Sequence, residues 1–345
     1  MGGGQARQRD RIRVKFLSRT AGEVFVRQFP QGVPLWGGCE FLFDPDAADY
    51  DWLVVYDDLP PLADERFSRR VERLACPRHN TLLVTTEPET IKIYGRAYTA
   101  QFGHVLTSQR QWALPHPGRI HSQPALHWFY GWGSRRLLGY DEIAAGRPEK
   151  EAEIATVCSE KQQRHTLHHR RYRFVQELKA RLPELEIYGH GVRDMDDKAE
   201  SLDRYRYHVA IENYRGPHHW TEKLADCFLG LSLPFYYGCD NVDDYFPRES
   251  LIRIDIADPD GAARVIRRAM ADDEYGRRLP ALLEARRLVL EEYNLFAVLS
   301  REIEARHRPG AGGGEIRSRR LANKGSALQS AAYGLEKLVR RWRQR

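Results

Sequence analysis

A chain of 345 residues is longer than a single hydrophobic core usually supports, which favours two domains. The content of 42% hydrophobic, 11% aromatic and 30% charged residues excludes an intrinsically disordered protein, because disordered chains lack the apolar content that offsets ordering entropy. The net charge of +6 indicates attraction to phosphate or to an anionic surface, without saying which.

The 5 cysteines include no Cys-x-x-Cys pair, which argues against both a disulfide framework and a structural zinc site. The basic amino terminus lacks the apolar stretch of a signal peptide, and no window approaches the roughly 18 apolar residues that a membrane span needs. We therefore expect a protein that is neither exported nor transmembrane and that lies in the cytoplasm.

The first half of the chain alternates β-rich runs with turns, which predicts an α/β lobe. One helix is expected over residues 64–75, where Phe67, Val71 and Leu74 share a face. A long ordered loop is expected over residues 112–133, where breakers are frequent; its aromatic residues could stack on a sugar or pack in the core. The expected strands are 11–18, 23–29, 39–43, 51–59 and 80–88.

The second half of the chain alternates strands and helices more regularly, which is typical of a doubly wound parallel sheet. Such sheets bind ligands beyond the carboxyl ends of their strands. The expected strands are 154–159, 185–191, 205–213, 233–238 and 250–258, and the expected helices are 164–182, 221–231 and 259–272. We place the domains at 1–150, 151–310 and a basic tail at 311–345.

Chemistry-bearing residues gather where the strand 205–213 ends and the next helix begins. Glu212 and Asn213 close the strand, and Thr221, Glu222 and Lys223 open the helix. Free N–H groups at a helix start bind phosphate, and a lysine is unfavourable there unless it has an anionic partner. This favours a nucleotide site, although Thr221 could simply cap a helix whose next two residues face solvent.

Four linked elements carry a resemblance to a known family: Glu212-Asn213, Thr221-Glu222-Lys223, Pro234 with Tyr237-Gly238, and Pro247 with Ser250-Leu251-Ile252. Their order and spacing over residues 154–254 resemble the carboxyl-terminal lobe of the α-1,3/4-fucosyltransferases of bacterial type, glycosyltransferase family ten. The resemblance implies a GT-B fold, in which two Rossmann-like lobes face a central cleft. It also implies an inverting transfer of L-fucose from GDP-fucose to a hydroxyl of an acceptor glycan.

The resemblance assigns roles to individual residues of the donor site. Glu222 would bind the donor ribose or sugar, and Lys223 the diphosphate. Arg171 would also contact the diphosphate, with Arg170 and Arg173 as neighbouring alternatives. Fixed cations suit an inverting transfer without a metal, because charge develops on the leaving diphosphate.

The rest of the donor site comprises Glu212, Asn213, Thr221 and His219. His219 departs from the family, which usually has a tyrosine at that position. It could bond a donor phosphate or hydroxyl, or have no role. The same architecture could then serve another nucleotide sugar in surface-polysaccharide or lipopolysaccharide assembly, an alternative that stays open.

The general base is expected in the first lobe, as a carboxylate at a strand end. Glu87, followed by Pro88, resembles the first-lobe segment in which the family places the proposed base, and Glu89 is the alternative. Three Asp-x-Asp tripeptides start at Asp44, Asp194 and Asp258, and their number in an Asp-rich chain indicates chance rather than a metal site. Two of them flank prolines in apparent turns, where Asp is common. No metal site and no required cofactor are therefore expected, while stimulation by a divalent ion stays open.

The basic tail allows more than one binding partner for the protein. It could attach the protein to an anionic membrane, as a peripheral enzyme of the inner face acting on a lipid-linked acceptor, or it could be a solvated terminus. A nucleic-acid-binding protein is the alternative from another class, motivated by the sequence pI of about 9.0. Because no recognition motif accompanies the basic residues, we expect a nucleotide-sugar donor and a glycan acceptor, and no nucleic acid.

Overall fold

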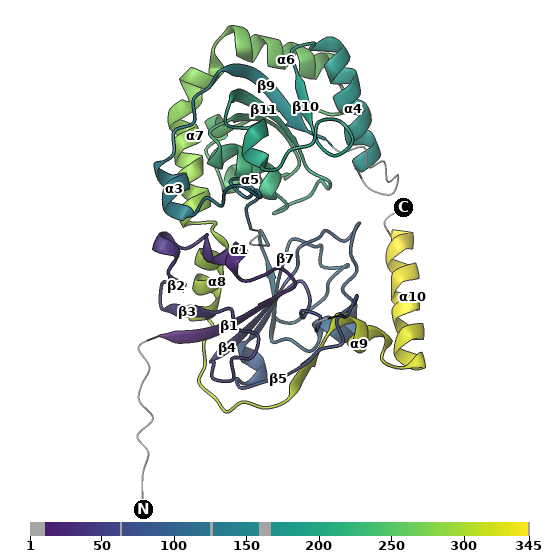
Figure 1. Ribbon diagram of the computed structural model, residues 1–345. Coiled ribbons are helices and arrows are strands. Elements are labelled where there is room, and N and C mark those ends of the chain that lie inside the picture. The colour runs from purple at the N-terminus through teal and green to yellow at the C-terminus, as the bar shows by residue number, and fades with distance from the viewer. Residues whose placement is uncertain (1–10, 63, 125–126, 159–166, 344–345) are drawn as a thin grey trace, which may run out of the picture.

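The computed structural model describes residues 11–62, 64–124, 127–158 and 167–343, and shows two α/β lobes facing each other (Figure 1). The first lobe holds a seven-stranded sheet in the order β2-β3-β1-β4-β6-β7-β8. Its neighbouring strands are parallel except for β2 and β3. The strands are β1 (Ile12–Ser18), β2 (Leu35–Trp36), β3 (Cys39–Leu42), β4 (Trp52–Tyr56), β6 (Thr81–Val84), β7 (His104–Thr107) and β8 (Arg119–His121).

The second lobe holds a five-stranded sheet in the order β10-β9-β11-β12-β13, and every neighbouring pair is parallel. This confirms the α/β class, and the two parallel-sheet lobes are the arrangement expected of the GT-B fold. The strands are β9 (Ala152–Val157), β10 (Glu186–Tyr188), β11 (Tyr205–Ile211), β12 (Leu233–Tyr237) and β13 (Ile252–Arg253).

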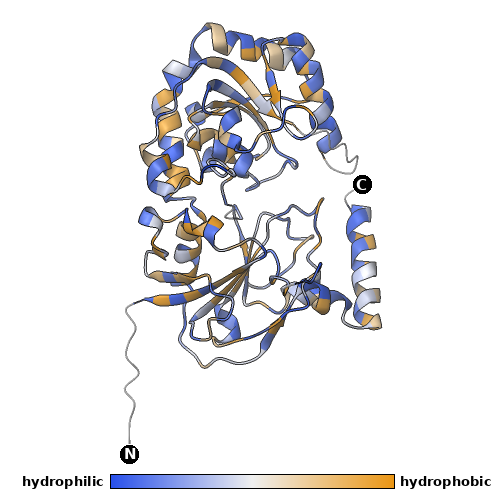
Figure 2. Ribbon diagram, in the orientation of Figure 1, coloured by the Kyte–Doolittle hydropathy of each residue, from blue (hydrophilic) through white to orange (hydrophobic). Residues whose placement is uncertain are grey.

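Helices cover both faces of the second sheet, and its strands contribute residues to two separate apolar cores. Figure 2 shows hydrophobic residues along these strands. Residues of β11 alternate between two cores: Val209 packs beside α4 (His168–Arg181) and α6 (Pro259–Ala271), whereas Ala210 packs beside α5 (Glu222–Leu229) and α7 (Glu274–Glu291). The expected helices 164–182, 221–231 and 259–272 correspond to α4, α5 and α6, although residues 164–166 lie outside the described residues.

The chain returns to the first lobe near its end, which corrects the expected domain limits. The helix α8 (Leu295–Glu304) lies within the expected second lobe, yet Leu295, Phe296 and Leu299 pack into the first-lobe core with Phe16. In the other direction, Trp128 and Ile143, from before residue 150, pack in the second-lobe core. Each lobe is therefore completed by a segment from beyond the expected boundary.

The tail after residue 310 is also part of the first lobe. Strand β14 (Glu315–Arg317) pairs antiparallel with β5 (Val71–Arg73), and α9 (Arg319–Lys324) and α10 (Ala327–Arg343) follow it. Ile316 and Ala322 are buried in a first-lobe core. The alternative of a solvated terminus does not hold over β14 and α9, because backbone pairing and apolar burial fix them to the lobe, whereas most residues of α10 are exposed.

Two local expectations in the first lobe are wrong. Residues 23–29 form the helix α1 (Glu23–Val26) rather than a strand, and residues 64–75 contain the short strand β5 rather than a helix. The apparent helical face does not hold, since Phe67 and Val71 are exposed and only Leu74 is buried. The strand forms because its partner β14 comes from far along the sequence, a pairing that local periodicity cannot reveal.

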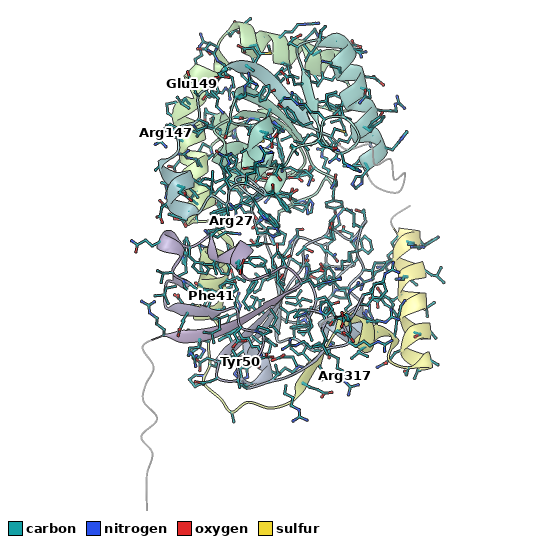
Figure 3. All side chains as sticks on the ribbon, in the orientation of Figure 1. Arg27, Phe41, Tyr50, Arg147, Glu149 and Arg317 are labelled. Atoms are coloured by element: carbon teal, nitrogen blue, oxygen red, sulfur yellow. The ribbon has the colours of Figure 1, made fainter. Side chains whose placement is uncertain are left out.

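The junction between the lobes is fixed by Arg27, which lies at the end of α1 (Figure 3). Its guanidinium donates hydrogen bonds to the carbonyls of Leu138 at 2.7 Å and of Trp128 and Tyr130 at 2.9 Å. A second anchor comes from the other lobe, where Asp226 accepts from the backbone N–H of Tyr130 at 3.2 Å. The connecting segment is thus tied to both lobes.

The remaining helices are short. They are α2 (Arg96–Thr99) and α3 (Tyr140–Ala145), with 3-10 turns at Pro30–Gly32, Arg78–Asn80, Lys198–Ser201, Val242–Asp244 and Arg248–Ser250. Across the described ranges, no helix combines the length and apolar character needed to cross a bilayer.

Candidate active site

A cavity of about 400 Å³ lies between the two lobes. The first lobe lines it with residues that follow the carboxyl ends of β1, β4 and β6, and the second lobe with the end of β11 and the start of α5. This is where parallel sheets place their ligand sites. The lining includes every predicted site residue except Arg171, together with two polar residues that were not predicted, Arg19 and Asp57.

The start of α5 is built on a buried carboxylate. Thr221 caps the helix, accepting from the N–H of Lys223 at 3.3 Å. Glu212 accepts the N–H of Thr221 at 2.8 Å and its hydroxyl at 2.6 Å. Glu212 is fully buried, and burial raises the pKa of its carboxyl. Both of its oxygens therefore hold the helix start in place, so Glu212 shapes the cavity wall.

Glu222 and Lys223 do not point into solvent, as the simple capping alternative would require. Both are half-buried and line the cavity, with Lys223 Nζ 2.7 Å from Glu222 Oε1. Burial would raise the pKa of Glu222, but Lys223 and Lys198 outweigh it and hold that pKa well below its usual range. The site therefore presents an ion pair of Glu222 and Lys223 at a helix start, where free backbone N–H groups can bind phosphate.

Arg171 lies behind this wall on α4. It is buried, and its Nη1 donates to Asn213 Oδ1 at 2.7 Å, while Asn213 itself lines the cavity. The two neighbouring arginines, Arg170 and Arg173, are exposed. Of these three arginines, Arg171 is the one that bonds a residue of the cavity lining.

His219 joins the two lobes. It is buried, and its Nδ1 lies 3.1 Å from the hydroxyl of Ser108, which follows β7 in the first lobe. Burial lowers the pKa of His219 to about 3, with repulsion from Lys223 acting in the same direction, so the ring is neutral near pH 7. Its ring also packs edge-on against Tyr214, with centroids 5.2 Å apart. His219 therefore has a structural role, because its hydrogen bond to Ser108 connects the two lobes.

Glu87 faces this wall from the first lobe. Its side chain is half-buried in the cavity lining, and Gln109 Nε2 donates to its backbone carbonyl at 2.8 Å, which fixes the strand end. Burial raises the pKa of Glu87, and Lys223 across the cleft partly offsets this. A carboxylate with a raised pKa, open to a cleft, is suited to accept a proton.

Glu89 is placed differently from Glu87. It is almost fully buried outside the cavity lining, where its Oε1 accepts the hydroxyl of Tyr214 at 2.7 Å and lies 3.7 Å from Arg110 Nε. The cavity geometry therefore favours Glu87 over Glu89 as the carboxylate that an acceptor could reach.

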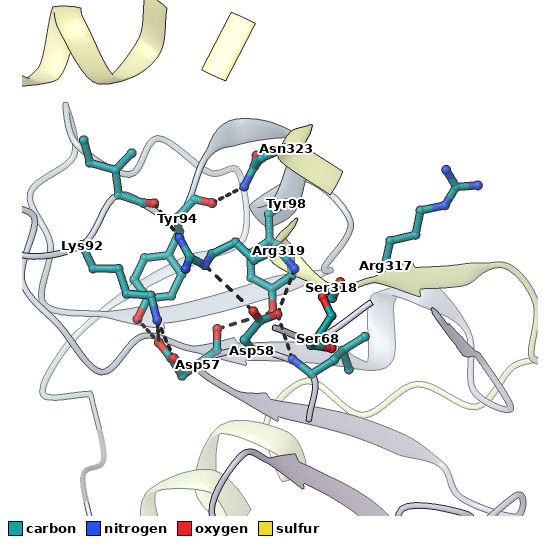
Figure 4. Close-up of polar contacts among 12 residues, drawn as sticks. Asp57, Asp58, Ser68, Lys92, Tyr94, Tyr98, Arg317, Ser318, Arg319 and Asn323 are labelled. Carbon is teal, nitrogen blue, oxygen red and sulfur yellow. Dashed lines mark hydrogen bonds and ion pairs between the residues drawn. The ribbon is translucent and has the colours of Figure 1, made fainter. Parts of the chain in front are cut away.

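The sequence reasoning missed Asp57, which lines the cavity beside Glu87. It accepts hydrogen bonds from Lys92 Nζ at 2.6 Å and from the hydroxyl of Tyr94 at 2.7 Å (Figure 4). The hydroxyl of Thr86 donates a third hydrogen bond to it at 3.0 Å. Burial would raise its pKa, but Lys92 and the hydroxyl donors outweigh this and lower it. Its place after the apolar run 52–56 was the available signal, because such strand ends meet at the ligand-binding edge.

No group of three or more His, Cys, Asp or Glu side chains in the described part of the chain is arranged to hold a metal ion. His218 bonds the hydroxyl of Tyr245 at 2.6 Å, whereas its neighbour His219 faces Ser108. Asp258, from one of the Asp-x-Asp tripeptides, caps α6 by accepting from the N–H of Gly261. His218, His219 and Asp258 therefore each bond a neighbouring protein group.

Comparisons with known proteins agree with the geometry of the second lobe. Residues 147–277 match the family described as glycosyltransferase family 10 (fucosyltransferase) C-term. A crystal structure of an alpha1,3-fucosyltransferase is similar with 14% identity, covering 81% of this chain and 84% of that one, at a TM-score of 0.47. The structure of an alpha1,3-fucosyltransferase with GDP-fucose gives 13% identity, the same coverage and the same score.

A more distant likeness is to the crystal structure of TarM, with 9% identity over 74% of this chain and 50% of that one, at a TM-score of 0.42. Among curated proteins, none matches the sequence. The assignment therefore rests on the second lobe, which carries both the family match and the motif at the start of α5. Residues 147–277 carry the likeness to glycosyltransferase family 10, the fucosyltransferase family, and this likeness indicates a glycosyltransferase.

Proposed function

We propose that the protein is an inverting glycosyltransferase that moves L-fucose from GDP-fucose to a hydroxyl of an acceptor glycan. The observation that carries the proposal is one cavity in which Glu87 of the first lobe faces Glu222 and Lys223 of the family 10 lobe. A base on one side and a diphosphate site on the other are the two parts that such a transfer needs.

The donor would bind against the second lobe. Lys223, at the start of α5, and Arg171, which reaches the site beside Asn213, would contact the diphosphate. Glu222 is ionised and would accept hydrogen bonds from the ribose or the fucose hydroxyls. Asn213, Thr221 and His219 would complete the donor wall, while Glu212 holds that wall from behind.

In the transfer step, Glu87 would take the proton from the acceptor hydroxyl as its oxygen attacks the anomeric carbon of fucose. The bond from that carbon to the diphosphate oxygen breaks, and GDP leaves with the electron pair. Attack on the face opposite the leaving group inverts the configuration at the anomeric carbon. The cations of Lys223 and Arg171 would stabilise the charge that develops on the diphosphate.

The test is transfer or hydrolysis measured across GDP-fucose, other GDP-sugars, UDP-sugars and CMP-sugars. We expect turnover with GDP-fucose and competitive inhibition by GDP. Turnover of another nucleotide sugar beside an inactive GDP-fucose reaction would replace fucose by that sugar and leave the two-lobed transfer mechanism in place.

The location of the acceptor is a second part of this proposal. The helix α10 exposes apolar side chains, with Leu328 81% and Trp342 77% exposed, along a segment rich in arginine. An amphipathic basic helix of this kind binds anionic membranes. We propose a peripheral enzyme at the cytoplasmic face of the membrane that meets a lipid-linked glycan, as in surface-polysaccharide assembly.

Vesicle co-sedimentation tests the attachment. Leu335→Gln combined with Trp342→Ser should release the protein from vesicles that contain anionic lipid, because both apolar side chains are largely exposed. Activity on a water-soluble acceptor should stay unchanged. Equal sedimentation of the variant and the parent protein would contradict membrane attachment through α10.

A further inference from the structure

A second polar cavity, of about 220 Å³, lies where the C-terminal helices meet the first lobe. Its walls come from the loop after β1, the end of β4, the loop before β5, and the helices α9 and α10. The lining residues are Arg19, Asp58, Phe67, Ser68, Arg319, Arg320, Asn323, Lys324, Tyr333 and Lys337. Five of these carry a positive charge, and Asp58 is the one acid among them.

The single acid of this cavity, Asp58, already accepts hydrogen bonds from the protein backbone. Asp58 Oδ1 accepts the backbone N–H of Leu59 at 2.9 Å and that of Arg319 at 2.8 Å, as Figure 4 shows for Arg319. Arg319 Nε is buried without a hydrogen bond to any described residue, and it lies 4.0 Å from Asp58 Oδ2. Asp58 can therefore neutralise at most one of the five positive charges in the cavity lining.

The other four cations have no acidic partner among the described residues: Arg19, Arg320, Lys324 and Lys337 form no ion pair there. Burial lowers the pKa of Lys337, and repulsion from Lys324 and Arg319 acts in the same direction. Surface cations are usually dispersed among acids, so a crowded, unneutralised group inside a cavity favours an anionic ligand.

Two aromatic rings complete the walls. The guanidinium of Arg320 lies 5.0 Å from the ring centroid of Phe67, and Lys337 Nζ lies 4.7 Å from that of Tyr333. Phe67 is exposed rather than packed in a core. The rings hold the cationic side chains in place and offer flat apolar surface beside them.

This cavity adjoins the candidate active site. Arg19 lines both cavities, and the neighbours Asp57 and Asp58 at the end of β4 line one cavity each. A ligand long enough to span the two would enter the active site from the first lobe, on the side of Glu87 and opposite the donor wall. That is the side from which an acceptor must approach.

We propose that this cavity is an acceptor subsite that binds an anionic group, such as a carboxylate, sulfate or phosphate, carried by the acceptor a short distance from the hydroxyl that is modified. The inference rests on the transfer reaction proposed above. It assigns α9 and α10 a part in acceptor selection, and it states that the enzyme distinguishes charged from neutral acceptors.

Direct binding gives the first test. Inorganic phosphate is titrated into the full-length protein saturated with GDP, so that the donor site is filled, and the phosphate ³¹P line width is followed. Broadening is expected for the parent protein and should be lost in Lys324→Glu/Lys337→Glu. The control is Arg264→Glu/Arg268→Glu, which makes the same change in net charge on exposed positions of α6 in the other lobe.

Acceptor selection gives the second test. Oligosaccharides are compared in neutral form and in a form bearing one sulfate or carboxylate, by kcat/KM. We expect the parent protein and the α6 control to prefer the charged form, and Lys324→Glu/Lys337→Glu to lose roughly tenfold of that preference with activity on neutral acceptors unchanged. Thermal unfolding shows whether each variant is folded, and the charge-neutral Lys324→Gln/Lys337→Gln should give an intermediate preference.

The outcomes separate this inference from the proposed function. Phosphate binding that survives in Lys324→Glu/Lys337→Glu, or equal use of charged and neutral acceptors by the parent protein, overturns the subsite. Loss of binding to anionic vesicles with an unchanged acceptor preference also overturns it and assigns the cations to the membrane. Absence of GDP-fucose turnover counts against the donor assignment, and the phosphate titration then still decides whether the cavity binds anions.

Discussion

The two walls of the cleft are built in different ways. The second-lobe wall comes largely from one stretch, residues 212–223, in which a strand end, a loop and a capped helix start follow one another. The first-lobe wall combines three strand ends that are far apart in the sequence, near Arg19, Asp57 and Glu87. A continuous motif can be found by reading along the chain, whereas a wall made of separate strand ends needs the sheet order to be known.

The largest expected effect breaks the first-lobe wall. Glu87→Gln keeps the shape but removes the base, so transfer should fall by about 10²–10⁴-fold while GDP affinity stays unchanged. Single-turnover kinetics and GDP titration measure the two quantities. Glu89→Gln is the comparison, because Glu89 lies outside the cavity lining. An equal or greater loss in Glu89→Gln would move the base to that residue.

The next effect breaks the second-lobe wall. Lys223→Met removes the ammonium that would face the leaving diphosphate, so kcat should fall by about 10²-fold and GDP should bind more weakly. This separates the walls, since Glu87→Gln should leave GDP binding intact. Lys179→Met, on the same lobe but away from the cavity lining, is the control. Unchanged GDP affinity in Lys223→Met would remove the diphosphate role.

A smaller effect is on stability. Thr221→Val removes the hydroxyl that donates to Glu212 at 2.6 Å and caps α5. A buried carboxylate that loses a donor, together with a lost cap, should lower the free energy of unfolding by about 2–3 kcal/mol. Denaturant titration measures this. Glu212→Gln in the same background should recover part of the loss, because the buried charge is gone; a further loss would contradict this account.

The smallest effect is a shift in pH dependence. Burial raises the pKa of Glu87 above its ordinary value of 4.5, so the base becomes protonated as pH falls through the raised value. Transfer should therefore decline on the acid side with a midpoint above 4.5, and Glu87→Gln should lose this limb. The pH profile of kcat/KM is the measurement, and a midpoint at or below the ordinary value would contradict the assignment.

The raised pKa of Glu87 also makes its contribution to folding stability depend on pH. Because the folded state binds this proton more tightly than the unfolded chain does, the contribution of Glu87 is favourable at low pH and is lost as pH rises through its raised pKa. Glu222 behaves in the opposite sense, since its lowered pKa makes it favourable at neutral pH and less so in acid. The two carboxylates that face each other across the cleft thus differ in environment and in role.

Much of the second lobe could be predicted from the sequence. Strand runs such as 205–211 are apolar enough to be recognised, and Thr221 followed by a helical pattern marks the start of α5. The elements that were wrong, residues 23–29 and 64–75, lie in the first lobe. The run 71–73 is a strand only because β14 pairs with it from the other end of the chain.

Some side chains of the site could be predicted from the sequence, and others could be found only in the structure. The sequence indicated Glu222 and Lys223 through their position at a helix start, and the resemblance singled out Glu87 before the structure placed it in the cavity. The sequence could not show that both carboxylate oxygens of Glu212 accept hydrogen bonds from Thr221, or that Asp57 lines the cavity. Those facts depend on which neighbours burial brings within hydrogen-bonding distance.

The sequence by itself determined the α/β class, the capped helix start with Glu222 and Lys223, and the family resemblance, because each depends on residues that lie close together along the chain. Only the tertiary structure decided that α8, β14, α9 and α10 complete the first lobe, and that Glu87 faces the cleft while Glu89 does not. These outcomes depend on contacts between distant segments, whose free energy comes from burial and pairing that no local pattern contains.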